Sequence, residues 1–309
     1  MTDPGSPPPI VAVVGATASG KTALSLDLAA HLGGEIVNTD AMAVYRGMDI
    51  GTAKPPFEAR RGITHHLLDT HDPDEPLSVA EFQAEARAVI ADLRDAGVTP
   101  VLVGGSALYT RAVLDRFEFP GTDPAVRRRL EEQLEAVGAR AMHQRLAEAD
   151  PDAAERILPD NGRRIVRALE VVELTGRPFS ASLPRLTYHD PATVQVGVDI
   201  DRETLDRRIE ARVAAMFEAG LVEEVAALLE TWGELGRTAA TAIGYREVTA
   251  YLAGELTLEE ARERTTTATR RFARKQESWF RKDPRITWVG FDDHDRVEKA
   301  LAAVGHRIP

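Results

Sequence analysis

Hydrophobic and polar positions alternate along the first third of the chain with two different periods. Three short apolar runs have the length of buried strands: residues 10–14, 35–39 and 100–103. The stretches between them have helical spacing: residues 22–32, stopped by Gly33-Gly34, and residues 78–96, opened by the capping box S-x-x-E and stopped by Gly97. Strands that alternate with helices predict an α/β fold with a parallel sheet.

The pattern changes at Pro120. Residues 123–183 have helical spacing, many charges and no strand signal, and Asp123-Pro124 forms a helix start. Strand character returns at residues 194–199, and it is followed by helical stretches through residue 232, at 243–252 and at 258–281, and by a strand at 286–290. We therefore expect an all-helical insertion at residues 122–192 in a core formed by residues 10–121 and 193–309, after a disordered leader at residues 1–9. Residues 63–69 carry a weaker strand signal.

The first strand leads into GATASGKT at residues 15–22, which fits the P-loop pattern G-x-x-x-x-G-K-[ST]. In such a loop, successive backbone N–H groups and the positive end of the following helix surround a phosphate group. Lys21 adds a charge, and the hydroxyl of Thr22 is available to Mg²⁺. We therefore expect a P-loop NTPase-like parallel sheet flanked by helices, a phosphate chain bound at the loop, and Mg²⁺ as cofactor.

A carboxylate, Asp40, follows the second predicted strand, at the sheet edge where α/β proteins bind ligands. The later strand VLVGG ends in glycine where a magnesium-binding Walker B aspartate would stand. We therefore expect Asp40 to accept a proton from an attacking hydroxyl or amine; a turn or cap role is the alternative. The irregular stretch MAVYRGMDIGTAKPP after it is too polar for core and is typical of a loop that lines a site.

Composition narrows the class of protein. The absence of Cys excludes disulfides, thiolate zinc sites and a cysteine nucleophile, and His65-His66 lacks a partner at ligand spacing, so we expect hydrogen bonding there rather than a metal. With 43% hydrophobic residues, no signal peptide and no membrane-length apolar run, we expect a cytoplasmic protein without membrane partners. The net charge of −11 argues against indiscriminate nucleic-acid binding, yet residues 261–285 carry nine Lys and Arg against three acidic residues.

Seven segments occur in the order and spacing of one enzyme family: GATASGKT, NTDAMAVYRGMDIGTAKP, HHLLD, VGGSALY, RRIVRALEV, AIGYRE and RFARKQESWFR. On these segments, which extend from about residue 10 to residue 290, the chain resembles the bacterial tRNA dimethylallyltransferases, or tRNA isopentenyltransferases, of the IPP transferase family. The P-loop is common to many families, whereas DxxxxYRGMDIGTAKP is specific to this one.

The resemblance implies an activity. The loop would hold the diphosphate of dimethylallyl diphosphate rather than ATP, through Gly15, Ala16, Thr17, Ala18, Ser19, Gly20, Lys21 and Thr22. The dimethylallyl group would pass to the exocyclic N6 amine of adenosine 37, 3′ to the anticodon, in tRNAs that read codons starting with U. Diphosphate would be released, and we expect the enzyme to act as a monomer.

The resemblance also implies roles for single residues. Asp40 would be the general base, Thr17 and Arg212 would contact the diphosphate, and Arg208, one turn before Arg212, is the rival for the cationic role. The implied tRNA contacts are Asp40, Ala41, Met42, Ala43, Ser106, Arg127, Arg163, Arg164, Ile165, Val166 and Arg167. The chain departs from the family pattern in three segments: Asp40-Ala41-Met42-Ala43 replaces D-S-x-Q, Ser106-Ala107 replaces T-G, and Arg163 replaces a Gln.

The basic helix at residues 258–281 allows two interpretations. Its stripes of Arg270, Arg274 and Arg281 and of Arg271, Lys275 and Lys282 suit contact with an RNA backbone and plain solubility equally well. For its aromatic residues, Phe272, Trp279 and Phe280, we expect packing in the core rather than base stacking.

Three alternatives stay open. The first is a P-loop kinase for a small hydroxyl compound, and the second is an adenylate isopentenyltransferase that acts on free nucleotides. The helical insertion and the basic helix argue against the second, because a mononucleotide needs no clamp. The third is an RNA-binding protein with an inactive P-loop.

Overall fold

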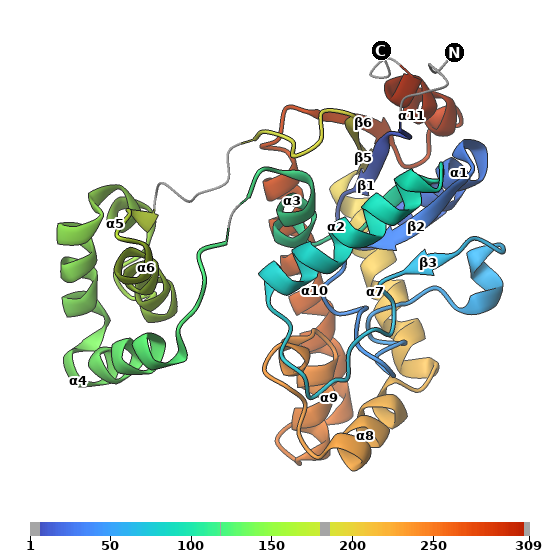
Figure 1. Ribbon diagram of the computed structural model, residues 1–309. Helices are drawn as coiled ribbons and strands as arrows, with labels where there is room; N and C mark the ends of the chain where they lie inside the picture. Colours follow the sequence, from blue (N-terminus) through green and yellow to red (C-terminus); the bar gives the residue numbers. More distant parts are fainter. Residues whose placement is uncertain (1–6, 118, 180–185, 306–309) are drawn as a thin grey trace. The chain divides into compact units, whose positions relative to one another are not determined.

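The computed structural model describes residues 7–117, 119–179 and 186–305, and its chain forms two compact units. The first contains residues 1–114 and 190–309, and the second contains residues 115–189 (Figure 1). Residues 1–6 of the predicted leader and residues 180–185 at the end of the predicted helical stretch lie outside the described residues.

The first unit contains a six-stranded sheet in the order β3-β2-β4-β1-β5-β6, and every pair of neighbours is parallel. The strands are β1 (Ile10–Val14), β2 (Gly34–Asn38), β3 (His65–His66), β4 (Thr99–Val103), β5 (Thr193–Asp199) and β6 (Ile286–Gly290). All five residues of β1 are buried, as expected for a central strand covered on both faces. Asn38, the last residue of β2, pairs with Val103, the last of β4, and Val103 pairs with Val13 of β1, so β2, β4 and β1 end close together at the carboxyl edge.

Helices cover both faces of this sheet. Because crossovers between parallel strands are right-handed, α1 (Lys21–Leu32), which precedes β2, and α2 (Val79–Asp95), which precedes β4, lie on opposite faces. α1 packs with α11 (Arg296–Gly305) in one core, where Leu24 and Leu28 meet Val304 and the strands. α2 begins at the predicted capping box and packs against α3 (Ala107–Leu114).

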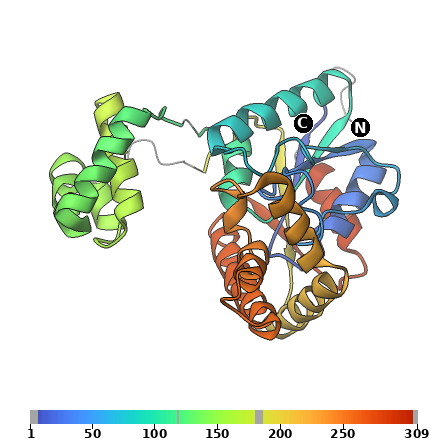
Figure 2. The same ribbon diagram turned by 90° about the horizontal axis from the view of Figure 1, so that it is seen from below.

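Four more helices form a layer beside the P-loop: α7 (Arg202–Glu218), α8 (Leu221–Trp232), α9 (Tyr245–Leu252) and α10 (Leu258–Phe280). α10 packs against α7 and α9 and reaches α3, and Figure 2 shows these helices gathered together in gold, orange and red. Ala16 of the P-loop is buried among Ile209 and Val213 of α7 and Ala273 of α10. No helix in residues 7–117, 119–179 or 186–305 combines the length and apolar character needed to cross a membrane.

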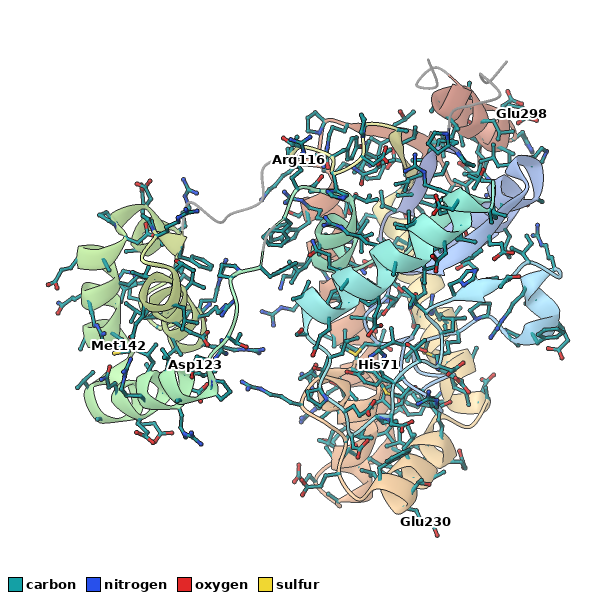
Figure 3. All side chains as sticks on the ribbon, viewed as in Figure 1. His71, Arg116, Asp123, Met142, Glu230 and Glu298 are labelled. Carbon is teal, nitrogen blue, oxygen red and sulfur yellow. The ribbon has the colours of Figure 1, made fainter. Side chains whose placement is uncertain are left out.

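The second unit is helical, with α4 (Pro124–Ala149), α5 (Pro151–Arg156) and α6 (Gly162–Thr175). Asp123 caps α4 as predicted, and Gly138, with φ 81° and ψ 162°, interrupts that helix. The helices bury a core that includes Leu130, Met142 and Leu146; Figure 3 labels Met142 among them. The unit spans Asp115–His189, whereas the sequence predicted an insertion at residues 122–192.

The α/β fold with a parallel sheet is confirmed, and the predicted strand at residues 63–69 needs correction. At residues 63–69 only His65–His66 pairs as a strand, because Leu67 (φ 60°) and Asp69 (φ 57°) leave the extended conformation. Three elements were not predicted from the sequence: α11 and the short 3₁₀ turns Phe57–Arg60 and Ala239–Thr241. The other predicted strands and helices of the first unit lie within about two residues of their expected bounds, the usual uncertainty of helix ends.

Candidate active site

The P-loop joins β1 to α1 at the carboxyl edge of the sheet. Its two glycines adopt backbone angles that other residues rarely reach: φ is 142° at Gly15 and 100° at Gly20, the N-cap of α1. A Cβ atom on Gly15 would also lie 3.2 Å from the carbonyl oxygen of Val198 on β5. The sequence therefore closes a tight turn against the sheet.

Some backbone N–H groups of the P-loop already have a hydrogen-bond acceptor within the protein. The N–H of Thr17 donates to Gln276 Oε1 (2.8 Å), and the N–H of Ser19 donates to the carbonyl of Ala16 (3.3 Å). Ala16 and Ser19 are themselves buried. Within residues 7–117, 119–179 and 186–305, no acceptor lies within hydrogen-bonding distance of the N–H groups of Ala18, Gly20, Lys21 and Thr22. Of the eight predicted diphosphate residues, Thr17 and Ser19 thus have N–H groups that already donate within the protein.

Two cations and one carboxylate share this edge of the sheet. The ammonium of Lys21 donates to the carbonyl of Ala16 (2.6 Å). Burial and then the charge of Arg212 lower the pKa of Lys21 to about 7, while Asp40 acts in the opposite direction. Burial also lowers the pKa of Arg212, with Asp40 opposing and Arg208 adding to the effect. Two positive charges against one negative charge favour the binding of an anion.

Arg212 and Arg208 have different roles although both lie on α7. Arg212 lines two cavities at the carboxyl edge of the sheet and forms no ion pair with any residue that the structure describes. Arg208 donates from Nε to the carbonyl of Ala18 (2.7 Å), and its guanidinium lies 5.3 Å from the ring centre of Phe291. Arg212 is therefore the arginine placed to contact a ligand, and Arg208 supports the loop from outside.

Asp40 is held in place by Asn38 at the end of β2. The N–H of Asp40 donates to Asn38 Oδ1 (2.9 Å), and Asn38 Nδ2 donates to the carbonyls of Asp40 (2.9 Å) and Leu67 (3.0 Å). Asp40 Oδ1 accepts the N–H of Met42 (2.9 Å), which is the turn role considered above. Asp40 Oδ2 has no hydrogen-bond partner among the described residues, so the same carboxylate retains a free basic oxygen.

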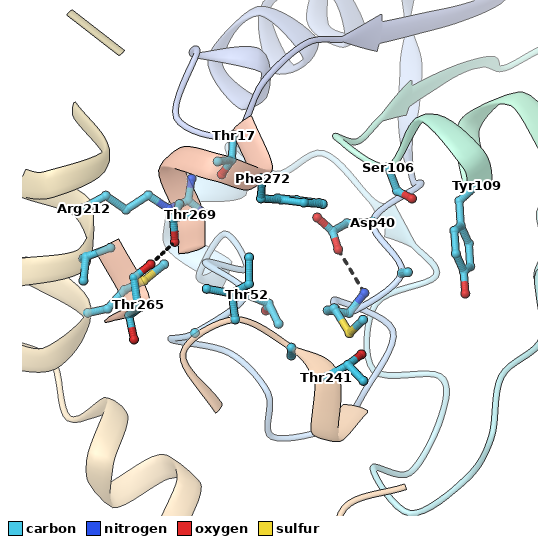
Figure 4. Close-up of a pocket in the computed structure, with 17 residues that line it drawn as sticks. Thr17, Asp40, Thr52, Ser106, Tyr109, Arg212, Thr241, Thr265, Thr269 and Phe272 are labelled. Carbon is cyan, nitrogen blue, oxygen red and sulfur yellow. Dashed lines mark hydrogen bonds between the residues drawn. The ribbon is translucent and has the colours of Figure 1, made fainter. Parts of the chain in front are cut away.

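Two adjoining cavities of the first unit meet at Asp40. The inner cavity, of about 120 Å³, is bounded by the P-loop residues Thr17, Lys21 and Thr22. The outer cavity, of about 380 Å³, has a mainly apolar lining that includes Met42, Tyr109, Val213, Met216 and Ile243. Both are lined by Thr17, Asp40, Thr52, Arg212 and Phe272. Figure 4 shows Asp40 and Phe272 between Arg212 on one side and Ser106 with Tyr109 on the other.

The predicted tRNA contacts of the first unit lie at these cavities. Ala41, Met42 and Ser106 line the outer cavity, and Ala43 lines the inner one. Ala41 and Ala43 are buried, so at these two positions the chain contributes space rather than polar groups.

The predicted tRNA contacts of the second unit differ in how accessible their side chains are. Ile165 is 0% and Val166 is 2% exposed, because both face the core of the helical unit, so their side chains are closed to RNA. Arg127 and Arg167 both pair with the buried carboxylate of Glu170, and Arg167 also donates to the carbonyl of Pro120 (2.6 Å). Burial raises the pKa of Glu170, but the hydrogen bonds from these two arginines lower it overall.

Arg163 and Arg164 remain as exposed cations of that unit, and neither forms an ion pair within the part of the chain that the structure describes. They are therefore the two arginines of the predicted set that are available to a phosphate backbone.

The aromatic residues of α10 differ from the expectation. Phe280 is buried as predicted, but Phe272 is 39% and Trp279 is 46% exposed, so the expected core packing is wrong for these two. Phe272 instead lines both cavities. The two basic stripes of α10 also differ in their contacts. Arg270 pairs with Glu210 and Arg281 with Asp199, whereas Arg271 and Lys275 line a groove along α9 and α10.

Several residues of the site were not singled out from the sequence, among them Thr52, Tyr109 and Gln276. Thr52 and Tyr109 belong to the segments DIGTAKP and VGGSALY. These segments indicated the family, but nothing in them indicated that these two residues line the site. Gln276 interrupts a charged helical stretch, where a polar residue is typical of a solvated face.

Comparison with known proteins assigns the family. A family profile described as IPP transferase matches residues 43–283. The chain belongs to the IPP transferase family. An IPP transferase relative from a Nocardioides strain, named tRNA dimethylallyltransferase, is 71% identical over 296 residues, which cover 96% of this chain and 96% of the relative. A relative of the same name from Streptomyces coelicolor is 57% identical over 293 residues, covering 94% of this chain and 93% of the relative.

Solved structures confirm the expected fold of this IPP transferase. A full-length tRNA isopentenylpyrophosphate transferase from Bacillus halodurans matches with a TM-score of 0.71 at 38% identity and covers 97% of each chain. A eukaryotic dimethylallyltransferase acting on tRNA matches with a TM-score of 0.81 at 27% identity, covering 95% of this chain and 76% of that chain.

Proposed function

We propose that this IPP transferase moves the dimethylallyl group of dimethylallyl diphosphate to the exocyclic N6 amine of adenosine 37 in tRNAs that read codons starting with U. The observation that carries this proposal is the meeting of two unlike cavities at Asp40, one cationic and one mainly apolar. Its relatives, which are named tRNA dimethylallyltransferases, support the same reaction class.

The inner cavity suits the diphosphate of the donor. The bond that breaks joins carbon to oxygen, so the site must stabilise the negative charge of the departing diphosphate. Lys21 and Thr22 of the loop line this cavity, so the Lys21 ammonium and the unpaired N–H groups of these two residues can meet the charge, and Arg212 of α7 lines the same cavity. These groups are fixed before the reaction starts, so little reorganisation opposes the step.

Mg²⁺ fits this arrangement as an ion coordinated mainly by the diphosphate group of dimethylallyl diphosphate. Within residues 7–117, 119–179 and 186–305, no three His, Asp or Glu side chains are grouped as a metal site. Thr22 and Asp40 line the inner cavity and offer oxygen ligands, and Mg²⁺ commonly binds one or two protein oxygens, phosphate oxygens and water. When bound, the ion would neutralise part of the charge on the diphosphate.

The outer cavity suits the acceptor. An adenine stacked in an anticodon loop must leave the stack to reach the donor, and aromatic and apolar side chains such as Tyr109 and Phe272 can hold the extruded base. As its amine nitrogen forms the new bond to carbon, its proton passes to the free Oδ2 of Asp40. General-base help of this kind contributes roughly 10²- to 10⁴-fold.

The test is incubation of the purified protein with unmodified tRNA, dimethylallyl diphosphate and Mg²⁺, followed by nucleoside mass analysis and mapping of the modified position. We expect dimethylallyl adenosine at position 37 of tRNAs that read U-initial codons and none in other tRNAs. Phosphate transfer from labelled ATP would instead support a kinase, and prenylation of free AMP would support the nucleotide-specific alternative. Binding of tRNA without product would indicate an inactive P-loop.

We also propose that the enzyme acts as a monomer in the cytoplasm. Light scattering during gel filtration should give the mass of one chain, with and without tRNA.

A further inference from the structure

The carboxylate of Glu224 on α8 binds three consecutive backbone N–H groups of the loop after Asp40. Its Oε2 accepts from Asp49 (3.1 Å) and Ile50 (2.7 Å), and its Oε1 accepts from Gly51 (3.3 Å). Successive N–H groups that converge on one point form an anion-binding concavity. Here the anion is a side chain of the same protein, 173 residues further along the chain than Gly51.

Tyr245, at the start of α9, completes this arrangement. Its hydroxyl donates to Glu224 Oε1 (2.5 Å), and the side chain is fully buried. Burial, followed by the charge of Glu224, raises the pKa of Tyr245, so the hydroxyl keeps its proton and remains a donor. A Cβ atom on Gly51 would lie 2.3 Å from the Tyr245 ring, so the loop backbone already packs against that ring without spare room.

The loop held in this way is one wall of the outer cavity. Gly51 and Thr52 line it, and the Thr52 hydroxyl donates back to the carbonyl of Met48 (2.5 Å). Glu224 itself lines neither cavity, and the P-loop is not among its partners. Of the loop residues, Gly51 lines the outer cavity alone and Thr52 lines both cavities, so the position of Glu224 affects the acceptor side of the site more than the diphosphate side.

We propose that Glu224, assisted by Tyr245, is a positioning residue that fixes residues 49–52 as the wall against which the tRNA acceptor is held. This inference rests on the proposed function, because it assigns the outer cavity to the acceptor. It predicts that weakening the Glu224 contacts impairs the use of tRNA while the affinity for dimethylallyl diphosphate is kept.

Glu224→Gln tests this with little change of shape. The amide keeps one acceptor oxygen, but its NH₂ group then faces backbone N–H donors, and the negative charge is lost. Glu223→Gln is the matched control, because Glu223 is the exposed neighbour on the same helix and undergoes the same change of charge. We expect Glu224→Gln to lower kcat/KM for tRNA by roughly tenfold or more, as loss of hydrogen bonds to a charged group does. The dissociation constant of dimethylallyl diphosphate should stay within roughly twofold, and Glu223→Gln should match the wild type in both measurements.

Tyr245→Phe provides a second variant in case Glu224→Gln folds poorly. It removes one donor and keeps the carboxylate, so we expect a smaller loss in kcat/KM for tRNA, again without loss of donor affinity. The proposal is overturned if both variants use tRNA like the wild type, or if donor affinity and tRNA use fall together. Absence of any prenylated tRNA with the wild-type protein would instead overturn the proposed function.

Discussion

The backbone N–H of Thr17 in the P-loop donates to the side-chain oxygen of Gln276 on α10, at 2.8 Å and across 259 positions of sequence. The amide nitrogen of Gln276 donates in turn to the carbonyl of Gly105, also at 2.8 Å, in the turn after β4. A Cβ atom on Gly105 would lie 2.3 Å from that nitrogen. One buried amide thus fixes the P-loop and the turn before Ser106 relative to each other.

Replacement of Gln276 by Met should therefore weaken both the fold and the site. The change keeps the approximate shape but leaves the part-buried N–H of Thr17 and the buried carbonyl of Gly105 without partners, which costs up to about 1–3 kcal/mol for each group. We expect a lower melting temperature and a lower kcat/KM for both substrates. Ser278→Ala, at an exposed position of the same helix, is the control and should change neither. Wild-type stability in Gln276→Met would refute the role of this amide.

Asp40→Asn should separate catalysis from binding. The amide oxygen can still accept the N–H of Met42, so the turn after β2 is kept while the basic carboxylate is lost. We expect kcat to fall by roughly 10²- to 10⁴-fold, with the donor bound at least as tightly because a negative charge has left the cationic site. Single-turnover rates and donor titrations check this. A kcat within a few-fold of wild type would show that another group takes the proton.

Donor binding should depend on pH through Lys21. Its pKa in the ligand-free protein is lowered to about 7, so the ammonium is present below that pH and is lost as the pH rises through it. A bound diphosphate favours the charged form, so binding should take up a proton, and the affinity should decrease between about pH 7 and pH 9. Calorimetry in two buffers of different ionisation enthalpy measures the uptake. Lys21→Arg stays charged and should flatten the profile; an equally steep profile in this variant would assign the titration elsewhere.

Arg212→Gln and Arg208→Gln form a matched pair on α7. Arg212 lines both cavities without an ion-pair partner among the described residues, whereas Arg208 binds the carbonyl of Ala18 from outside the cavities. We expect Arg212→Gln to weaken donor binding by roughly 10- to 100-fold, the effect of losing a charged hydrogen bond, and Arg208→Gln to have a smaller effect. Equal losses in the two variants would contradict the assignment.

In the helical unit, tRNA binding and stability should depend on different arginines. Replacing Arg163 and Arg164 together by Gln should weaken tRNA binding and reduce the slope of log affinity against log salt by about 1 to 2, with the melting temperature unchanged. Arg127→Gln removes one partner of the buried Glu170, so it should destabilise the unit by about 1–3 kcal/mol. The prediction fails if Arg127→Gln is as stable as the wild type and if this variant, rather than the Arg163 and Arg164 double variant, reduces the salt dependence of tRNA affinity.

The sequence by itself determined the order of strands and helices in the core, the P-loop and the family. Ile10–Val14 is apolar at every position, and Gly15 and Gly20 are spaced for one turn, so these signals are local. Asp40 could also be placed at the carboxyl edge of the sheet, because it directly follows a recognisable strand.

Only the tertiary structure decided how single polar residues are used. Arg208 and Arg212 lie one turn apart on α7 and look alike in sequence, yet one binds the loop's backbone and the other lines the cavities. Ile165 and Val166 belong to a segment that the resemblance assigned to tRNA, but the helical core buries them. Gln276 and Glu224 reach partners more than 170 residues away in sequence. Such contacts depend on which faces of distant helices and loops pack together, and the spacing of residues within one segment does not predict this.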